Sequence, residues 1–583
     1  MNFIKRLFNG ENVNLEFTNE KDRDNLKYPE YSLFRYFEDA ALKYPDNIAL
    51  EYYGKSTTYK RLYEKITTIS KSLKSIGVNE KDRVTICMPN TPEAIIMFYA
   101  VNMIGAVSSM IHPLSSENEI EYYIEASESK YILTINLFAS KVIEASKNQT
   151  IKKVIIADIS DGMFTFMKSA IGVYDAFKNF MYSYDSTKIK YNDKVIKWSD
   201  FYNIGLDYEG DFIFDSKPDD EAVILYSGGT TGKPKGVRLS NYNFNALSMQ
   251  CIAEFNEAKP GDSILLVLPI FHGFGLGVSM HTILTHGMKC VLIPKFKSNE
   301  LAKLIRRYKP VFLTGVPTMY EALIKNKENS NYLKCVKYCI CGGDLLQESL
   351  RNKVNNYLFN HGSSAQIRVG YGLTESTAAC ILTPNYYYKE NAIGLPFPDT
   401  FVKVVKPGTT KELRFNRTGE ICISGPTIML GYLNEEEETN NTLITHDDGR
   451  VWLHTGDLGY KDKSGILFFS SRLKRMIVTS GYNVYPQYME KIIENHPAVE
   501  TCIVVGIPHP YKKQVPVACI VLKNNYYPGE ELTRNIKNYC EKSIAKYAMP
   551  YRYEYIKNVP KTIIGKINYK KLEDECTKKY SKQ

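Results

Sequence analysis

The sequence predicts an α/β fold, with a large N-terminal domain of mixed sheets flanked by helices and a small C-terminal α+β domain. The first reason is length, because 583 residues are too many for one ordinary hydrophobic core. The second is order, because short apolar runs alternate along the chain with segments of helical period. The third is a basic run, SSRLKRMI, which follows Gly465 and precedes residues with a helix-and-strand pattern of their own.

The alternation begins near the N-terminus. Apolar residues at helical spacing predict a helix over Ser32–Tyr44, and Pro45 ends it. We expect Ile48–Tyr53 to form a strand. Helical spacing returns over Tyr59–Ile76, and Gly77 is a residue that commonly stops a helix.

Later apolar runs continue the pattern towards the C-terminus. Four of them predict strands separated by helical or turn-rich sequence: Ala222–Tyr226, Ile264–Ile270, Val311–Gly315 and Val336–Cys341. Closer to the end, Tyr488–Asn495 predicts a helix and Val499–Val505 a strand. We therefore expect a large domain over residues 1–471, a hinge over 472–475 and a small domain over 476–583.

Composition favours a soluble globular protein, since 44% of the residues are hydrophobic and 24% are charged. The formal charge of +10 suits polyanionic small molecules or an anionic membrane surface, although a solvated lysine-rich face is the more common cause of such a charge. No dense basic arm or base-stacking module accompanies this charge. A nucleic-acid partner is therefore not expected.

The cysteines and the apolar runs indicate the compartment. The twelve cysteines include no CxxC pair, and the cluster Cys335, Cys339 and Cys341 offers zinc no convergent ligands. Buried free thiols, which suit a reducing compartment, are the better interpretation. The N-terminus lacks the apolar stretch of a secretory signal, and the run around Ala94–Val107 is too short to span a bilayer. We expect a cytoplasmic protein, with peripheral contact at the inner face of the membrane left open.

The segment Asp161–Asp207 is rich in aromatic and basic residues. Several of its apolar residues share one helical face: Met163, Met167, Ala170, Ile171, Tyr174, Phe177 and Met181. A helix packed on the main body explains this stripe. The alternative is an amphipathic surface that meets a membrane or an acyl chain.

The loop Ser227–Gly236, SGGTTGKPKG, follows a predicted strand and precedes Ser240, a suitable helix N-cap. Glycines let backbone N–H groups converge on an anion without obstruction from Cβ atoms. The loop combines small residues with hydroxyl donors and positive charges: Ser227, Gly228, Gly229, Thr230, Thr231, Gly232, Lys233 and Lys235. A Walker loop would need a glycine where this chain has Ser227 and a hydroxyl residue where it has Pro234. The loop therefore predicts phosphate binding by a site of another kind.

With Tyr226 before it, this loop resembles the phosphate-binding motif of the adenylate-forming superfamily, which includes acyl-CoA synthetases, firefly luciferase and peptide-synthetase adenylation domains. Further motifs of that family follow in order: YGLTES at Tyr371–Ser376, GEICISGPTIMLGY at Gly419–Tyr432, TGD at Thr455–Asp457, SRLKRMIVTSGYNVYP at Ser471–Pro486 and PKTIIGK at Pro560–Lys566. The resemblance covers nearly the whole chain. It implies a small C-terminal domain that moves during the reaction.

The resemblance also implies how ATP is bound. Gly342, Gly343 and Asp344 resemble the segment that lines the adenine, and Tyr371 would stack on the base. Gly372 and Thr374 belong to the same expected set of ATP-binding residues. Asp457 and Arg472 would reach the ribose, where a carboxylate can accept hydrogen bonds from both hydroxyls. Glu375, together with Thr230, would hold the Mg²⁺ that accompanies ATP, because a carboxylate beside a triphosphate needs an intervening cation.

Lys566 is the expected principal catalytic group. In the family its ammonium lies between the substrate carboxylate and the α-phosphate, and it offsets the charge that builds as they join. The small domain then swings about a pivot that maps to Lys474, and the region around Gly481 approaches the tunnel through which a thiol enters. His272, in LPIFHGFG, resembles the histidine that guards the acyl pocket in acyl-CoA synthetases, and we assign it no acid–base role.

Departures from the family pattern bear on activity and substrate. Ser471, Tyr488 and Tyr569 stand where the family usually has Gly, Glu and Arg, and none of them removes a charge that the mechanism requires. Gly228 replaces a more usual Ser, and the double glycine resembles bacterial long-chain fatty acyl-CoA synthetases. The segment 161–207 and the GGDLL run at Gly342–Leu346 fit the same subgroup.

The sequence thus predicts an enzyme that activates a medium- or long-chain fatty acid with ATP and Mg²⁺ and transfers the acyl group to CoA. The closest alternative is an acyl-AMP ligase that loads the thiol of an acyl carrier protein. A non-catalytic nucleotide- or lipid-binding protein would be expected to lack Lys566 or Glu375. A phosphotransferase would need a Walker lysine–hydroxyl pair or kinase motifs. Acyl chain length, pathway and oligomeric state leave no readable signal in the sequence.

Overall fold

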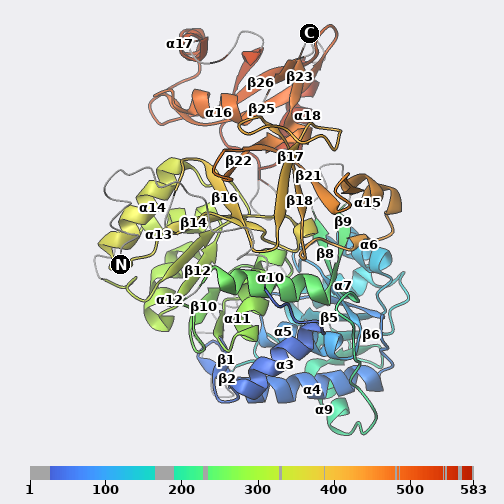
Figure 1. Ribbon diagram of the computed structural model, residues 1–583. Helices are drawn as coiled ribbons and strands as arrows, with labels where there is room; N and C mark the ends of the chain where they lie inside the picture. Colours follow the sequence, from blue (N-terminus) through green and yellow to red (C-terminus); the bar gives the residue numbers. More distant parts are fainter. Residues whose placement is uncertain are drawn as a thin grey trace. The chain divides into compact units, whose positions relative to one another are not determined.

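The computed structural model describes residues 26–163, 189–227, 234–255, 257–326, 331–385, 388–479, 482–484, 486–541, 544, 548–561 and 567–580 (Figure 1). The chain divides into a first unit of residues 1–229, 233–401 and 423–453 and a second unit of residues 230–232, 402–422 and 454–583. Helices and strands alternate in both units, which confirms the predicted mixed α/β fold. The hinge at 472–475 stays a prediction.

The first unit contains a long run of mainly parallel strands, in the order β16-β15-β14-β13-β12-β10-β11-β1-β2. The strands from β14 to β1 are parallel neighbours, and antiparallel pairs flank them at both ends. Their bounds are β1 (Ile48–Tyr52), β2 (Lys55–Thr58), β10 (Ser263–Leu266), β11 (Lys289–Leu292), β12 (Phe312–Gly315), β13 (Tyr338–Cys341), β14 (Ile367–Tyr371), β15 (Ile381–Leu382) and β16 (Ala392–Pro396).

Side chains of these strands alternate between two hydrophobic clusters. Leu265, Leu313 and Cys339 belong to one cluster, whereas their neighbours Ile264 and Phe312 belong to the other. Three helices bury apolar residues in the first of these clusters, and Figure 1 shows them together on one side of β10 and β12: α12 (Leu301–Tyr308), α13 (Pro317–Ile324) and α14 (Glu348–Asn360). This sheet is therefore covered on both faces, as parallel sheets require.

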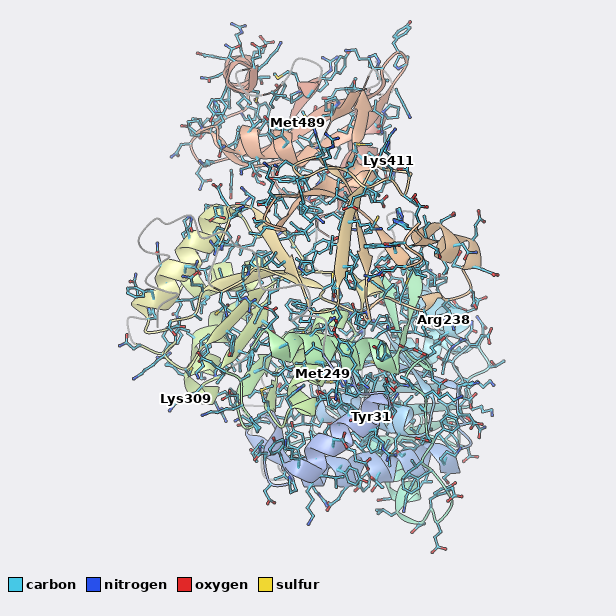
Figure 2. The ribbon with its side chains drawn as sticks, in the orientation of Figure 1. Tyr31, Arg238, Met249, Lys309, Lys411 and Met489 are labelled. Atoms are coloured by element: carbon cyan, nitrogen blue, oxygen red, sulfur yellow. The ribbon has the colours of Figure 1, made fainter. Side chains whose placement is uncertain are left out.

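A second sheet of the first unit has the order β19-β9-β8-β4-β3-β5-β6-β7. The strands from β8 to β7 are parallel, and β9 and β19 add antiparallel pairs at one edge. Their bounds are β3 (Arg83–Cys87), β4 (Val107–Met110), β5 (Tyr131–Ile135), β6 (Lys153–Ala157), β7 (Val195–Lys197), β8 (Glu221–Ser227), β9 (Lys235–Ser240) and β19 (Gly431–Tyr432). Arg238 of β9, labelled in Figure 2, forms an ion pair with Glu221 of β8.

Helix starts follow from capping residues in the sequence. Ser32, Thr58 and Thr91 accept a backbone hydrogen bond at the N-termini of α3 (Leu33–Lys43), α4 (Tyr59–Ser75) and α5 (Pro92–Met103). Ser240 caps α10 (Asn241–Ala253), as predicted. Among the described residues, the remaining helices of this unit are α6 (Glu117–Ser127), α7 (Ala139–Ala145), α9 (Trp198–Leu206), the π-helix η4 (Phe274–His281), α11 (Thr282–Thr285), α15 (Glu436–Thr442) and the 3-10 turns η1 (Asn136–Phe138), η5 (Ser298–Glu300) and η6 (Thr374–Ser376).

Two expected segments differ from the structure. The strand predicted to reach Ile270 ends at Leu266, because the Asn90 side chain takes over the backbone bonding beyond it: its amide donates to the Leu266 and Leu268 carbonyls, and its Oδ1 accepts from Ile270 N. The loop predicted to extend to Gly236 is shorter, because Ser227 pairs with Lys235 and Tyr226 with Gly236 in the β8–β9 ladder.

Helix α5 contains most of the longest apolar run, and every one of its residues is buried. Within the described part of the chain, no helix is both long enough and apolar enough to cross a bilayer. The apolar stripe predicted over Met163–Met181 lies outside the described residues, except for Met163, which is buried. Cys339 and Cys341 are buried free thiols, as predicted, and Cys335 is half-buried.

The second unit contains most of a strand set in the order β17-β18-β21-β22 and a separate sheet in the order β24-β23-β26-β25, with β27 paired to β26. The bounds are β17 (Phe401–Val405), β18 (Gly419–Ser424), β21 (Val451–Lys461), β22 (Leu467–Arg472), β23 (Ile477–Thr479), β24 (Tyr482–Val484), β25 (Val499–His509), β26 (Lys513–Leu522) and β27 (Arg552–Tyr555). The helices are η7 (Leu473–Arg475), a 3-10 turn, with α16 (Pro486–Glu494), α17 (Glu530–Glu541) and α18 (Tyr569–Tyr580). The predicted C-terminal helix and strand correspond to α16 and β25.

Candidate functional site

In the first unit, three predicted site segments leave the sheet at the carboxyl ends of β10, β13 and β14. In open α/β sheets this edge is where ligands bind. A Cβ on Gly342 would lie 3.1 Å from the Gly370 carbonyl oxygen and 3.1 Å from a ring carbon of Phe274. The segments that contain GGD, HGFG and YGLTES are therefore in contact at this edge, although they are distant in sequence.

Two glycines allow close backbone approaches at this edge, Gly273 between two of these segments and Gly372 within one. A Cβ on Gly273 would lie 2.1 Å from the Thr377 carbonyl oxygen, and one on Gly372 would lie 1.9 Å from that of Ala378. Neither distance is tolerable for a side-chain carbon, so the close approach of backbone to backbone requires glycine at both positions.

His272 lies beside this contact and is half-buried. Its Nδ1 accepts a hydrogen bond from Phe274 N at 3.3 Å, and its own backbone N donates to the Pro269 carbonyl. A neutral ring that accepts at Nδ1 carries its proton on Nε2. The structure therefore places His272 next to the segment of Glu375, which is compatible with its expected position near the substrate acid.

Glu375 belongs to η6, immediately after β14 and its half-buried final residue Tyr371. Its Oε1 accepts a hydrogen bond of 2.9 Å from the phenol of Tyr432. Sequence reasoning quoted the motif that ends in Tyr432 but assigned this tyrosine no role. Its position follows from pairing between β9 and β19, in which Tyr432 lies opposite Val237.

Lys235 completes this group at the end of the phosphate loop. Its Nζ lies 5.0 Å from the centre of the Tyr432 ring and forms an ion pair with Glu438. Burial, followed by the charge of Glu375, raises the pKa of Tyr432, so the phenol keeps its proton and remains a donor. The Lys235 ammonium, the neutral Tyr432 phenol and the Glu375 carboxylate thus lie next to one another in space, beside the described end of the loop.

The predicted loop residues Gly228, Gly229, Thr230, Thr231, Gly232 and Lys233 lie outside the described residues. Their flanks are described. Ser227 and Lys235 are cross-strand partners, and η6 lies against β8, the strand that leads into the loop. The loop ends and Glu375 are therefore neighbours in the same unit.

The predicted adenine-side residues are arranged around two turns. Gly343 and Asp344 are exposed after β13, and Gly343 has φ +79°, a value that favours glycine. Asp344 Oδ1 accepts from Leu345 N, which fixes the turn. Thr374 opens η6 on the neighbouring segment.

In the second unit, Asp457 and Arg472 lie opposite each other on β21 and β22. Arg472 Nε is 3.2 Å from Asp457 Oδ1, and the exposed fractions are 3% for the aspartate side chain and 52% for the arginine side chain. The TGD turn is fixed locally, because Glu420 accepts from Gly456 N and Thr455 Oγ1 accepts from Asp457 N. This pair places a carboxylate and a guanidinium together, as the ribose-binding prediction requires.

Two further predicted residues, Gly481 and Lys566, lie outside the described residues, and only the backbone of Lys474 is described, in η7. The flanks of Lys566 are described: Lys561 forms an antiparallel bridge with Ile567, and Asn568 N donates to the Pro560 carbonyl at 2.8 Å. The two described flanks of the segment that contains Lys566 are thus bonded to each other.

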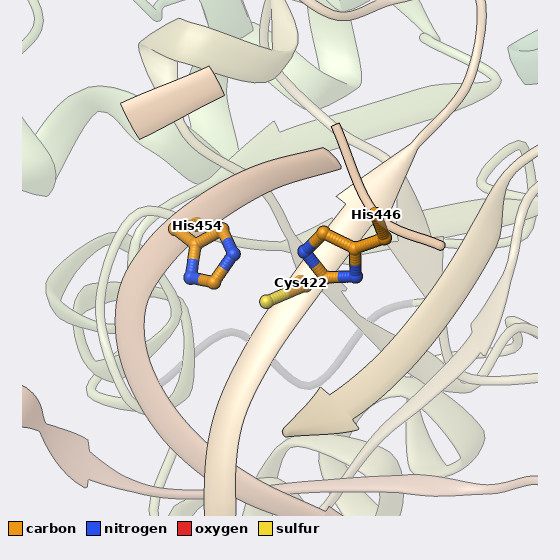
Figure 3. Close-up of side chains that lie close together, drawn as sticks. All are labelled: Cys422, His446 and His454. Carbon is orange, nitrogen blue, oxygen red and sulfur yellow. The ribbon is translucent and has the colours of Figure 1, made fainter. Parts of the chain in front are cut away.

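Cys422, His446 and His454 were not selected from the sequence, and Figure 3 shows their side chains close together. Their potential ligand atoms lie within 4.8 Å of one another. Burial raises the pKa of the Cys422 thiol, His454 Nδ1 is 3.0 Å from Glu420 Oε2, and His446 stacks on Trp452. The Cys422 thiol would have to release its proton before this group could bind a metal, and we assign no ion to it.

Comparison with known protein families gives two matches. Residues 37–433 match the family described as AMP-binding enzyme, and residues 488–566 match the AMP-binding enzyme C-terminal domain. Together the two matches include every predicted site residue except Asp457, Arg472, Lys474 and Gly481, which lie between them.

Individual relatives are similar over nearly their full length. The chain is 30% identical over 566 residues to a long-chain-fatty-acid–CoA ligase of Bacillus subtilis, covering 95% of this chain and 96% of the relative. It is 30% identical over 539 residues to 4-coumarate–CoA ligase 4 of Arabidopsis thaliana, covering 90% and 88%. Among solved structures, ATP-bound MatB from Rhodopseudomonas palustris has a TM-score of 0.80 at 23% identity, covering 95% of this chain and 100% of that one.

Proposed function

Because this chain belongs to the AMP-binding enzyme family, we propose that it activates a medium- or long-chain fatty acid with ATP and transfers the acyl group to CoA. It is an AMP-forming acid–thiol ligase. In the first half-reaction a fatty acid carboxylate would displace pyrophosphate from ATP and form acyl-AMP. In the second, the CoA thiolate would displace AMP. The observation that carries the proposal is the group Lys235, Tyr432 and Glu375 at the ligand-binding edge of the first unit.

We propose that Glu375 holds the Mg²⁺ of the nucleotide, with Thr230 as a second oxygen ligand. The fit rests on its chemistry, because Mg²⁺ prefers carboxylate and hydroxyl oxygens. Glu375 also has a fixed direction, because Tyr432 donates to its Oε1 and Met429 N donates to its backbone carbonyl. The bound ion would neutralise part of the triphosphate charge. Lys235 is the nearest described cation to the loop end and would add to that neutralisation.

Lys566 is proposed as the group that brings the two anions together. A carboxylate and an α-phosphate repel each other, and the transition state concentrates negative charge between them. An ammonium held there lowers that barrier and orients the attack. Asp457 and Arg472 would hold the ribose while this occurs. Tyr371 and the turn at Gly343 and Asp344 would hold the adenine.

The most specific part of the proposal is that the acid substrate is a fatty acid. It is supported by the similarity to the fatty-acid ligase of Bacillus subtilis and by the Gly228–Gly229 pair. The similarity to a 4-coumarate ligase keeps an aromatic acid as the competing substrate class. The acyl carrier protein remains the competing acceptor in the second step.

We also propose a cytoplasmic enzyme that touches the membrane from which its substrate comes. The supporting observation lies at the described end of the segment 161–207 and in the chain just beyond it, where Leu206 and Ile213 are 61% and 60% exposed. Exposed aliphatic side chains can enter a membrane interface, and the formal charge of +10 of the whole chain favours an anionic one. Binding to vesicles of anionic phospholipid, weakened by Leu206→Ser with Ile213→Ser, would support this contact.

The decisive measurement is acid-dependent ATP–pyrophosphate exchange with a panel of acids from acetate to palmitate and with 4-coumarate. We expect strong exchange with one chain-length class of fatty acid. Lys566→Ala should lower exchange by about 100-fold or more, because it removes a charge that acts in the transition state. Lys557→Ala, an exposed lysine nearby, serves as the matched control and should leave exchange unchanged.

Three results would contradict parts of the proposal. If Lys566→Ala had the same ATP–pyrophosphate exchange rate as the native enzyme, this lysine would have no catalytic role in adenylation. Release of orthophosphate as the primary product would exclude adenylation. Transfer to a carrier protein in preference to CoA would show that the carrier protein, not CoA, is the acceptor of the acyl group.

A further inference from the structure

The base of the segment that contains Lys566 is built from described residues of the second unit. Lys561 and Ile567 form a β-bridge, and Asn568 N bonds to the Pro560 carbonyl. Tyr569 follows as the first residue of α18, with Asn568 Oδ1 accepting from Lys571 N. Ile567 directly follows Lys566 in the chain, so Ile567–Tyr569 are the described C-terminal flank of the segment that contains this lysine.

The Tyr569 ring is held by a residue from the predicted hinge. The guanidinium carbon of Arg475 lies 3.8 Å from the centre of this ring, which is close contact for a cation on an aromatic face. Tyr569 is also partly buried against the apolar cluster that α18 shares with β25 and β26. One face of the ring therefore meets a cation that belongs to η7, far from α18 in sequence.

The guanidinium group of Arg475 is held in place by two hydrogen bonds at its edge. Its Nη2 donates to Glu490 Oε1 at 2.5 Å and to the Val504 carbonyl at 3.4 Å. The arginine and glutamate side chains are only 13% and 11% exposed, and Val504 N also donates to Glu490 Oε1. A planar guanidinium bound at its edge by α16 and β25 leaves its face for Tyr569.

We propose that Arg475 is a positioning residue for adenylation, which connects the hinge turn to the base of the catalytic-lysine segment through Tyr569. This inference rests on the proposed function, because it gives Arg475 a purpose only if Lys566 acts on the acid and ATP. It accounts for Tyr569, which departs from the arginine usual in the family. An aromatic ring presents a face to the Arg475 cation, whereas a second arginine would repel it.

The alternative is that Arg475, Glu490 and Tyr569 only stabilise the fold of the second unit. Variants can separate the two. Tyr569→Phe keeps the ring face, Tyr569→Leu keeps apolar volume without it, and Arg475→Lys keeps a charge near Glu490 without the planar group. The other end of α18 offers a matched control, because the Arg552 guanidinium lies 5.7 Å from the Tyr580 ring and is exposed.

The test measures the two half-reactions separately: ATP–pyrophosphate exchange, and thioester formation from preformed acyl-AMP and CoA. We expect Tyr569→Leu and Arg475→Lys to lower kcat for exchange about 10-fold, with little change in KM for ATP, because misplacement of a catalytic group affects the transition state. Thioester formation should stay within about 2-fold of the native rate, since Lys566 acts only in the first step. Tyr569→Phe should restore exchange, and Arg552→Lys should match the native enzyme.

The measurements distinguish a failure of the positioning role of Arg475 from a failure of the proposed function. Native exchange in Tyr569→Leu, equal losses in both half-reactions, or a loss in Tyr569→Phe as large as in Tyr569→Leu would each overturn the positioning role. Lys566→Ala, assayed in parallel, reports on the proposed function. If Lys566→Ala keeps its exchange, the proposed function fails at that lysine. If Lys566→Ala loses exchange and Tyr569→Leu does not, only the inference about Arg475 fails.

Discussion

The phenol of Tyr432 lies between a lysine and a glutamate, and this order determines how charge is arranged beside the described ends of the predicted phosphate loop. Lys235 approaches the face of the ring and Glu375 accepts from its hydroxyl. A glutamate that had to find its own orientation would lose side-chain entropy on binding a metal. The tyrosine reduces that loss because it holds one carboxylate oxygen in place before any nucleotide arrives.

Tyr432→Phe tests this arrangement at the residue scale. We expect about 10-fold lower kcat/KM for ATP in the exchange reaction, because a hydrogen bond to a charged group contributes on the order of 1.5–3 kcal/mol. The required Mg²⁺ concentration should rise as well. Tyr63→Phe removes a phenol–glutamate bond of 3.0 Å to Glu38, away from the site, and should leave exchange unchanged. Equal activity of Tyr432→Phe and native enzyme would contradict the role given to the phenol.

Sequence motifs predicted Tyr371, Glu375 and Asp457 as site residues but not the role of Tyr432. The difference is physical. Tyr371 and Glu375 belong to one short run that follows one strand, so a single motif carries both. The contact of Tyr432 depends on its strand lying beside β9, almost 200 residues earlier in the chain, and no local pattern reports such pairing.

At the scale of elements, helix α5 combines complete burial with a carboxylate in its first turn. Glu93 is 4% exposed, and its Oε2 has no hydrogen-bond partner among the residues that the structure describes. Burial raises the pKa of Glu93 to about 7, while its own backbone N–H and the charge of Lys65 act in the opposite direction. The folded protein therefore binds a proton here at pH values where the unfolded chain has lost it.

This predicts a pH dependence of stability. The contribution of Glu93 is fully present below pH 4.5, its ordinary pKa, and is lost as pH rises through about 7. Glu93→Gln stays neutral, so it should be more stable than the native enzyme at pH 8, on the order of 3 kcal/mol, and nearly equal to it at pH 4. Urea denaturation at the two pH values measures the difference. Glu117→Gln, an exposed first-turn residue of α6, should leave the pH dependence as it is, and the same response from both variants would refute the explanation.

Element boundaries were predictable where a local signal sets them. Capping residues and a left-handed glycine define α3 and α4, which match the predicted helices to within a residue or two. The C-terminal end of β10 was predicted too late. The reason is Asn90, a side chain from another segment that replaces the strand's backbone partners beyond Leu266. The apolar periodicity of a strand does not show that a distant side chain replaces its backbone hydrogen-bond partners.

At the scale of the whole molecule, the proposed site residues are distributed over both units. Lys235, Tyr371 and Glu375 belong to the first, and Asp457, Arg472 and Lys566 to the second. The predicted pivot, Lys474, lies in the short turn η7 of the second unit. The alternation of helices and strands predicted the fold class, but the strand orders depend on contacts between distant segments and could not be predicted from it.

Lys474→Pro tests whether this turn must rotate between half-reactions. Proline fixes φ near −65° and restricts the residue before it, so a backbone rotation at this position would be blocked. We expect exchange within about 3-fold of the native rate and thioester formation reduced about 10-fold or more. Lys474→Ala should keep both. Equal rates of thioester formation in the proline and alanine variants would show that rotation at this residue is not needed, provided that their melting temperatures agree.

The glycine contacts at Gly273 and Gly372 have a consequence for the history of such enzymes. Where main chain touches main chain at 1.9–2.1 Å from any added Cβ, a point mutation cannot adjust the spacing and can only disrupt it. The backbone spacing at these two positions of the proposed nucleotide site is thus closed to gradual change, whereas side chains elsewhere remain free to vary. A scaffold constrained in this way could accept new acids while its proposed nucleotide site stays unchanged. A fatty-acid ligase and a coumarate ligase are both 30% identical to this chain.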